Sequence, residues 1–306
     1  MAGRSAYQGS QRAIGEIEMC DEANLQSWAQ AQLSRRQFGA LAGVSVLAAG
    51  AAAPLYAAGA LSERVVNFAT PDGEADGFFV HPTEGKHPAV ILWPDIAGLR
   101  EAKRVIAREL AAQGFAVLVM NPYYRDVAGE QFTDFADFIA QGGFEKVTPW
   151  RSKLDSFAIG SDARTITMWL EEQDGVDYTR FVGVHGYCMG GPFAIWSAAT
   201  VPSRIKAAAS FHGAGLVREG SDSPVGQFKW LAKDGGTLIA VARNDDAKAP
   251  DDRGILAARA EELGLAVEVK LYPADHGWMV PDSPAFSAEQ ARQGEADLLA
   301  LYKARL

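Results

Sequence analysis

The sequence predicts an α/β domain with a mostly parallel central sheet and helices on both of its faces. Two observations support this fold class. Short, continuous apolar runs recur along the chain after residue 88, and helix-length amphipathic stretches separate most of them. Such runs are typical of strands that are buried on both faces. Strands that alternate with helices along a chain form a parallel sheet with helices packed against it.

The first expected elements form a β-hairpin. Apolar runs at 65–69 and 78–81 flank Pro71, Asp72 and Gly73, which together favour a turn. The chain then alternates between expected strands and expected helices. Strands are expected at 89–93, 115–120, 181–185, 205–211, 237–242 and 266–271, and helices at 100–113, from about 189, at 250–263 and at 287–306.

One segment departs from this alternation, and one proline supports an expected helix. Residues 126–150 are rich in Phe, Asp and Gly and show no clear periodicity. We expect them to cross the carboxyl edge of the sheet rather than to form a second domain. Pro250 suits the first turn of the helix expected at 250–263.

Residues 1–60 have the pattern of an export signal. Arg35 and Arg36 precede a stretch from 37 to 62 that contains no charged residue, and Ala58-Gly59-Ala60 offers a cleavage site. Followed by Phe38, the two arginines resemble the twin-arginine signal by which bacteria export folded proteins. We expect a cleaved signal and a periplasmic or secreted mature domain at 61–306, which meets the membrane only during export.

Two other interpretations of this segment stay open. Its uncharged stretch is long enough to be an uncleaved membrane anchor, and an alanine-rich disordered tail would have the same composition. Translation can start at Met1 or at Met19. The sequence does not decide between these starts.

Charge and cysteine content exclude several classes of protein. The chain has 29 Lys and Arg against 38 Asp and Glu, a formal net charge of -9, which disfavours a nucleic-acid partner. Its two cysteines are Cys20, which lies within the expected signal, and Cys188. The mature domain would therefore hold no intramolecular disulfide. No metal-ligand spacing or phosphate-binding glycine loop is present, so we expect neither a metal nor another cofactor. The oligomeric state stays open.

The segment Gly186-Tyr187-Cys188-Met189-Gly190 lies between an expected strand and an expected helix. This is the pattern of a nucleophile elbow with Cys in place of Ser. Such a tight turn needs small neighbours. It places the side chain at a helix N-terminus, where the helix dipole favours a thiolate.

The elbow requires an acid and then a base, each after a later strand. Asp245 follows the strand that ends at Ala242, and His276 follows the last strand; Asp246 is the alternative acid. The base would exchange protons with the thiol and the leaving group. The backbone N–H groups of Met189 and Ile96 are the expected oxyanion hole. Cys188, Asp245 and His276 occur in the required order, and each lies at the end of an expected strand. This combination favours catalysis over a packed turn with an inert cysteine.

These motifs resemble those of the dienelactone hydrolases, α/β-hydrolases with a Cys-His-Asp triad. The resemblance covers most of the mature domain, and the Gly-Tyr-Cys-x-Gly-Gly elbow is its most specific part. The supporting motifs are Trp93–Leu99, Asn121–Arg125, Asn244–Asp246 and Asp275–Trp278. The resemblance implies an α/β-hydrolase fold at 61–306 and cofactor-independent hydrolysis of a small lactone or ester.

The chain departs from the family at two positions. Family members usually carry Glu at the position of Asp95, where it holds the resting thiol, and Asp is one methylene shorter. The archetypal enzymes place an Arg four residues after the catalytic His to bind a substrate carboxylate; here that residue is Val280. Dienelactones and general carboxylic esters are therefore both candidate substrates.

The aromatic and polar residues at the sheet edge are candidates for substrate binding. We expect Tyr124, His212 and Trp278 in this role, with Tyr123 and Arg125 as further candidates. Two other functions stay open. A non-catalytic periplasmic binding protein would use the same fold with an unreactive Cys188, and a thiol redox protein is disfavoured because the mature domain lacks a resolving cysteine.

Overall fold

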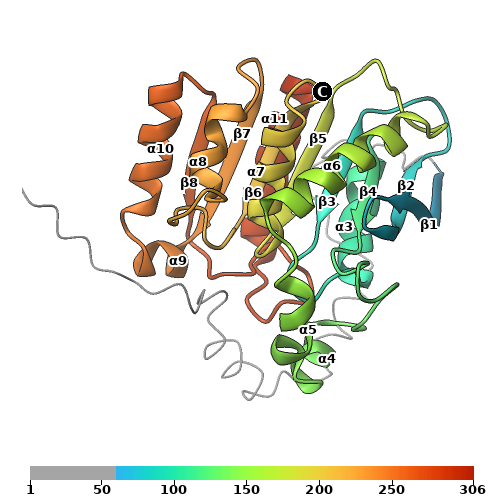
Figure 1. Ribbon diagram of the computed structural model, residues 1–306, viewed down its shortest axis with the longest axis horizontal. Helices are drawn as coiled ribbons and strands as arrows, with labels where there is room; N and C mark the ends of the chain where they lie inside the picture. The colour runs from blue at the N-terminus through green and yellow to red at the C-terminus, as the bar shows by residue number, and fades with distance from the viewer. Residues whose placement is uncertain (1–59) are drawn as a thin grey trace, which may run out of the picture.

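The computed structural model describes residues 60–306, which form an eight-stranded sheet in the order β1-β2-β4-β3-β5-β6-β7-β8 (Figure 1). β1 pairs antiparallel with β2 in a long hairpin, and β2 pairs antiparallel with β4; every other neighbouring pair is parallel. The strands are β1 (Leu61–Thr70), β2 (Gly73–Pro82), β3 (Ala89–Trp93), β4 (Ala116–Met120), β5 (Val182–Tyr187), β6 (Ile205–Phe211), β7 (Gly236–Ala242) and β8 (Val267–Tyr272). The predicted α/β class and the mostly parallel sheet are confirmed.

Helices cover both faces of the sheet. One face carries α3 (Glu101–Ala112) and α11 (Ala288–Arg305), and the other carries α6 (Ser156–Glu171), α7 (Gly190–Thr200) and α10 (Asp252–Leu263) (Figure 1). The buried side chains divide into two clusters, one for each face. Along β3, for example, Ile91 packs on the α7 side and Leu92 on the α3 side. This alternation explains why the strand is apolar throughout.

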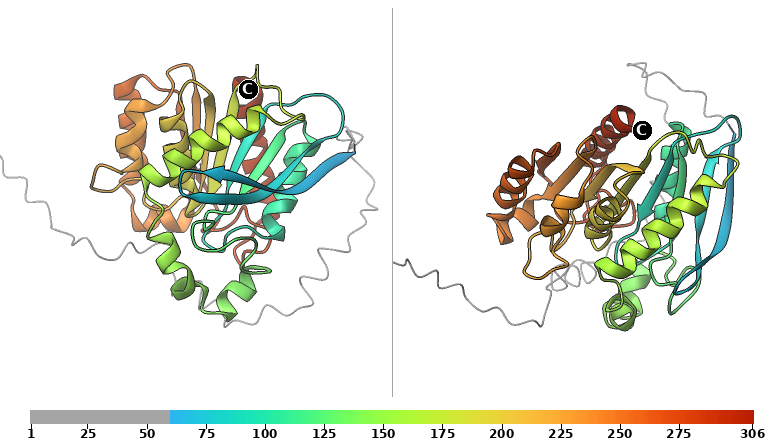
Figure 2. Two further views of the ribbon diagram at one scale, coloured as in Figure 1. Left: turned by 45° about the vertical axis from the view of Figure 1, so that its right-hand side comes forward. Right: turned by 45° about the horizontal axis from the view of Figure 1, so that its top comes forward.

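Several short helices lie in the connections. They are α4 (Phe135–Ala140), α5 (Gly143–Arg151), α8 (Pro224–Gln227), the 3-10 helix η1 (Phe228–Trp230) and α9 (Arg243–Lys248). The segment 126–150 therefore contains two helices that its sequence pattern did not indicate; the Asp134 side chain caps the first of them by accepting from the Asp137 N–H. Helices α4 and α5 lie together at one end of the sheet (green in Figure 2). Phe135 lines the same pocket as Cys188, so the segment does lie over the carboxyl edge.

Another difference concerns α6, for which the sequence analysis assigns no element. The Asp155 carboxylate caps this helix by accepting from the N–H groups of Phe157 and Ala158. The expected export signal at 1–60 lies, but for its last residue, outside the residues that the structure describes. No helix within 60–306 is both long and apolar enough to cross a membrane.

Candidate active site

Cys188 occupies the sharp turn between β5 and α7. Its φ of 51° is in the left-handed region, and its side chain is buried. A Cβ on Gly186 would lie 1.9 Å from the carbonyl oxygen of Gly190, and a Cβ on Gly190 would lie 2.5 Å from that of Trp93. Both positions therefore require glycine. The turn places Cys188 at the carboxyl edge of the sheet and at the N-terminus of α7.

The loops after β7 and β8 bring an imidazole and a carboxylate to this edge. His276 Nδ1 lies 2.7 Å from Asp245 Oδ2, and the His276 N–H donates to the Asn244 side chain at 2.8 Å. Burial alone would lower the pKa of His276. The charges of Cys188 and Asp245, and its hydrogen bonds to both, instead raise that pKa well above the ordinary value. This environment favours an imidazolium beside a thiolate.

The alternative acid, Asp246, points elsewhere. The Arg253 guanidinium donates to both of its carboxylate oxygens, at 3.1 Å for Nη2 to Oδ2. Of the two candidate acids, the structure brings Asp245 to His276 and directs Asp246 toward α10.

The two expected oxyanion donors are Ile96, in the loop after β3, and Met189, which is next to Cys188. Ile96 lines the pocket after β3, and Met189 follows Cys188 at the start of α7. Within residues 60–306, neither backbone N–H donates to another protein group. Tyr123 braces both residues, because its hydroxyl donates to the Ile96 carbonyl at 2.7 Å and contacts the Met189 sulfur at 3.5 Å. Tyr123 thus contributes to positioning rather than to the pocket wall.

Asp95 lines the pocket, but its carboxylate is held by two buried cations. Arg100 Nη1 lies 2.7 Å and Lys103 Nζ 2.8 Å from its oxygens, and the Ala97 N–H donates to it at 3.0 Å. Burial would raise the pKa of Asp95, yet these two cations hold it well below its ordinary value. The resemblance implied a carboxylate that holds the thiol; the observed arrangement is a fixed ion network.

Arg100, Lys103 and Asp282 are the residues of this network that sequence reasoning missed. Arg100 also binds Asp282, with Nε 2.6 Å from Oδ2, and both cationic side chains are fully buried. In the sequence they have the spacing of ordinary charged residues at the start of a surface helix. Asp282 lies 182 positions away from Arg100, so no local pattern joins them.

His212 is the expected substrate-binding residue that does reach the pocket. It follows β6 with a φ of 40°, and its Nδ1 accepts a hydrogen bond from the Cys188 N–H at 3.2 Å. Burial and the nearby His276 lower the pKa of His212 well below its ordinary value, so the ring is neutral. Because Nδ1 is an acceptor, the proton lies on Nε2. That buried N–H has no hydrogen-bond partner among the described residues.

The pocket is small and mostly apolar, with a volume of about 20 Å³. Its lining residues are Asp95, Ile96, Phe135, Cys188, His212, His276, Gly277, Val280 and Ser283. Within residues 60–306, no group of three or more His, Cys, Asp or Glu side chains is placed to hold a metal ion.

Two residues expected to bind substrate do not line this pocket. Trp278 is fully buried, and its ring stacks on Tyr272 with centroids 4.9 Å apart. The Trp278 and His212 rings pack edge to face with their centroids 5.0 Å apart, so Trp278 helps to position the His212 ring. The structure thus places Trp278 in the core and outside this pocket, because the chain after His276 turns its side chain inward.

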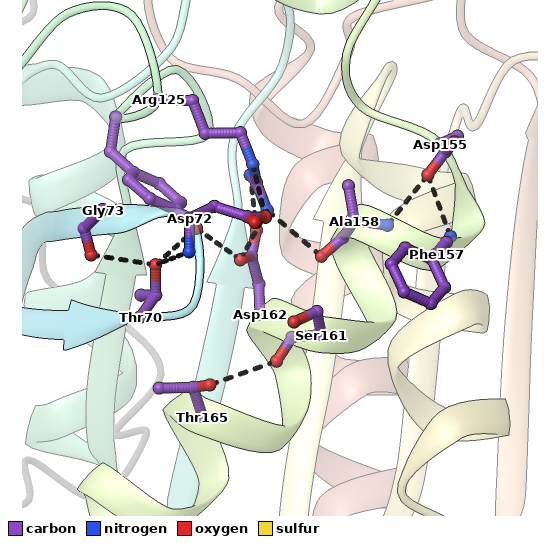
Figure 3. Close-up of polar contacts among 11 residues, drawn as sticks. Thr70, Asp72, Gly73, Arg125, Asp155, Phe157, Ala158, Ser161, Asp162 and Thr165 are labelled. Atoms are coloured by element: carbon purple, nitrogen blue, oxygen red, sulfur yellow. Dashed lines mark hydrogen bonds and ion pairs between the residues drawn. The ribbon is translucent and has the colours of Figure 1, made fainter.

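Tyr124 also lies outside this pocket. Its hydroxyl donates to Asp162 at 2.6 Å and lies 3.0 Å from the Thr70 hydroxyl. Its neighbour Arg125 binds the carboxylates of Asp162 and Asp72 (Figure 3). Both side chains therefore tie the β1–β2 hairpin to α6 and lie outside the pocket.

Comparison with known proteins agrees with this architecture. Residues 75–304 match the sequence signature of the dienelactone hydrolase family. The chain is 24% identical over 233 residues to a Synechocystis protein provisionally named carboxymethylenebutenolidase, covering 75% of this chain and 92% of that one. It is 25% identical over 226 residues to the carboxymethylenebutenolidase of Pseudomonas sp. strain P51, covering 72% of this chain and 87% of that one.

Solved structures show the same fold. A Klebsiella pneumoniae protein provisionally named dienelactone hydrolase superposes with a TM-score of 0.67 at 21% identity, over 80% of this chain and 99% of that one.

Proposed function

Because the chain belongs to the dienelactone hydrolase family of ester and lactone hydrolases, we propose that Cys188 is its nucleophile, with His276 as base and Asp245 as orienting acid. The observation that carries this proposal is the convergence of the three side chains at the carboxyl edge of the sheet. His276 hydrogen-bonds both to Cys188 and, at 2.7 Å, to Asp245. This is the geometry that nucleophilic catalysis by a thiol requires.

The first step is attack of the Cys188 thiolate on the substrate carbonyl. The carbonyl oxygen becomes negative, and the backbone N–H groups of Met189 and Ile96 stabilise it. Such donors contribute to catalysis because they are already oriented before the charge develops. Collapse of this intermediate breaks the bond to the alkoxide or enolate oxygen, which takes the proton from the His276 imidazolium. A lactone ring opens at this point, and an ester loses its alcohol.

The second step releases the acyl group from Cys188. His276, now neutral, removes a proton from water, and the resulting hydroxide attacks the thioester carbonyl. The thioester bond breaks, and the thiolate re-forms beside the imidazolium. Asp245 keeps Nδ1 of His276 protonated through both steps, so that the other ring nitrogen faces the sulfur.

The substrate is proposed to be a small, uncharged lactone or ester. The buried cations next to the pocket, Arg100 and Lys103, are already paired with Asp95 and Asp282. Val280 lines the pocket at the position where the archetypal enzymes of the family place a carboxylate-binding Arg. The unpartnered Nε2–H of His212 is a side-chain group in the pocket wall that is free to donate to a substrate oxygen.

The role of Cys188 is tested by comparing the rate of hydrolysis with the extent of alkylation of Cys188. In a Cys20→Ala background, Cys188 is the one cysteine left, so iodoacetamide modifies a single thiol. We expect p-nitrophenyl acetate hydrolysis to fall in proportion to carboxamidomethylation at Cys188, and a neutral lactone to be hydrolysed faster than a dienelactone carboxylate. Full turnover by completely alkylated protein would refute the role of Cys188.

We further propose that residues 1–60 direct export by the twin-arginine route. The basis is the pair Arg35 and Arg36 ahead of an uncharged stretch. Changing both to Lys should leave the protein in the cytoplasm of a bacterial host, as judged by fractionation. Unchanged export of the double variant would contradict the proposal.

A further inference from the structure

A second cavity lies on the opposite face of the sheet from α7, between α3, α11 and the segment 279–286. Its volume is about 260 Å³, just below the range of about 300 to 1,000 Å³ typical of sites for drug-sized ligands. Most of its wall is apolar. The lining residues are Ile106, Glu109, Leu110, Tyr187, Met279, Pro281, Phe286, Ala288, Ala291, Arg292, Glu295 and Leu298.

One wall of this cavity contains an unpartnered buried hydroxyl. Tyr187 is fully buried, and within residues 60–306 its hydroxyl has no hydrogen-bond partner. Burial raises the pKa of Tyr187, with smaller contributions from Glu109 and Glu295, so the phenol keeps its proton. A buried hydroxyl without a partner is destabilising. A ligand with a hydrogen-bond acceptor would satisfy it.

Two carboxylates line the cavity as well. Glu109 is exposed and Glu295 half-buried, and neither forms an ion pair within the described chain. Loss of hydrating water raises the pKa of both, and the charge of Glu295 raises that of Glu109 further. Arg292 also lines the cavity, so the three charged side chains sum to one negative charge. A cation would relieve the repulsion between the carboxylates.

We propose that this cavity binds a small molecule with an apolar body, one ammonium group and a hydrogen-bond acceptor. The ammonium would pair with Glu109 and Glu295, the apolar body would cover the wall formed by α3 and α11, and the acceptor would receive the Tyr187 hydroxyl. This site is separate from the pocket of Cys188 and does not depend on the function proposed for that pocket.

The two cavities share one segment of chain. After His276, the residues alternate between them, because Gly277 and Val280 line the pocket of Cys188 whereas Met279 and Pro281 line the second cavity. Tyr187 also directly precedes Cys188 in the elbow. A molecule bound in the second cavity therefore contacts the segment that carries the proposed base.

The test is calorimetric titration of the full chain with 4-methoxyphenethylamine, which has the three required features. Cys188 is first blocked with iodoacetamide, so that binding is measured without turnover. We expect saturable binding that the anionic analogue 3-(4-methoxyphenyl)propanoate does not show. The double variant Glu109→Gln/Glu295→Gln should weaken binding about tenfold or more, because hydrogen bonds to charged groups are lost.

Two further variants make the result decisive. Glu289→Gln, on the same helix α11 but outside the cavity, should bind as the wild type does. Tyr187→Phe keeps the ring and should weaken the methoxy compound but not unsubstituted phenethylamine. Equal binding of the amine and the propanoate, or unchanged binding by both the double variant and Tyr187→Phe, would overturn the proposal. Either result would leave the function proposed for Cys188 unaffected.

Discussion

Replacing Asp95 by Asn would remove the carboxylate that neutralises two buried cations. Arg100 keeps a second partner, since its Nε and Nη2 also donate to Asp282 at 2.6 and 2.8 Å. Lys103 has no other ion-pair partner among the described residues. Breaking a buried ion pair by removing one partner typically costs about 3 to 5 kcal/mol.

The contribution of Lys103 to this cost is limited. With Asp95 present, burial lowers the pKa of Lys103 to about 8. At pH 7 the ammonium can therefore release its proton for about 1 to 2 kcal/mol, because one pKa unit corresponds to about 1.4 kcal/mol. The weakened hydrogen bonds from Arg100 to a neutral Asn add a similar amount or more. We expect Asp95→Asn to lower the free energy of unfolding by about 3 kcal/mol.

Urea unfolding of the full chain, followed by tryptophan fluorescence, measures this change. The difference should shrink between pH 7 and 8, because the unfolded variant binds the Lys103 proton whereas the folded one has released it. Asp95→Asn/Lys103→Met should recover part of the loss by removing the unpaired cation. Glu101→Gln is the control. It breaks an exposed ion pair with Arg108 in α3, the helix that also contains Lys103, and should change stability by at most about 1 kcal/mol. A stability of Asp95→Asn within about 1 kcal/mol of wild type would refute the role assigned to the network.

Three further predictions concern the active site. The imidazolium of His276 should keep Cys188 reactive at low pH, so the rate of its alkylation by iodoacetamide at pH 6 should be within a few-fold of the rate at pH 8. A rate at pH 6 about a hundredfold below that at pH 8, as for a free thiol, would contradict the ion pair. His212→Phe should lower kcat/KM for p-nitrophenyl acetate about tenfold or more by removing the Nε2–H, and His212→Gln should retain more activity; equal rates for the two variants would exclude a hydrogen bond from this residue. Gly186→Ala should cost about 3 kcal/mol or more, because its Cβ meets the Gly190 carbonyl; a Tm equal to wild type would show that the elbow can relax.

The sheet and the elbow could be predicted because their signals are local. Each strand buried on both faces is a continuous apolar run, as β3 and β4 show. The elbow follows from Gly186 and Gly190 on either side of Cys188, positions where a Cβ has no room. Asp245 and His276 could be placed near Cys188 because parallel strands end at one edge of a sheet.

The directions of the other side chains at the sheet edge could not be predicted, because they depend on contacts between distant segments. Tyr124 and Trp278 follow strands just as His212 does, but the direction of each side chain is set by partners that no local pattern reveals. For Tyr124 the partner is Asp162, and for Trp278 it is Tyr272. The ion network of Asp95 was missed for the same reason.

The central claim is that Cys188 carries out the attack, and the most direct measurement compares p-nitrophenyl acetate hydrolysis by wild type, Cys188→Ala and Cys20→Ala. We predict that Cys188→Ala lowers kcat/KM by about a thousandfold or more, while the oxyanion donors leave a small residual rate. Cys20→Ala should match wild type. A Cys188→Ala enzyme that keeps its fold and retains at least about a tenth of wild-type kcat/KM would contradict the proposed mechanism.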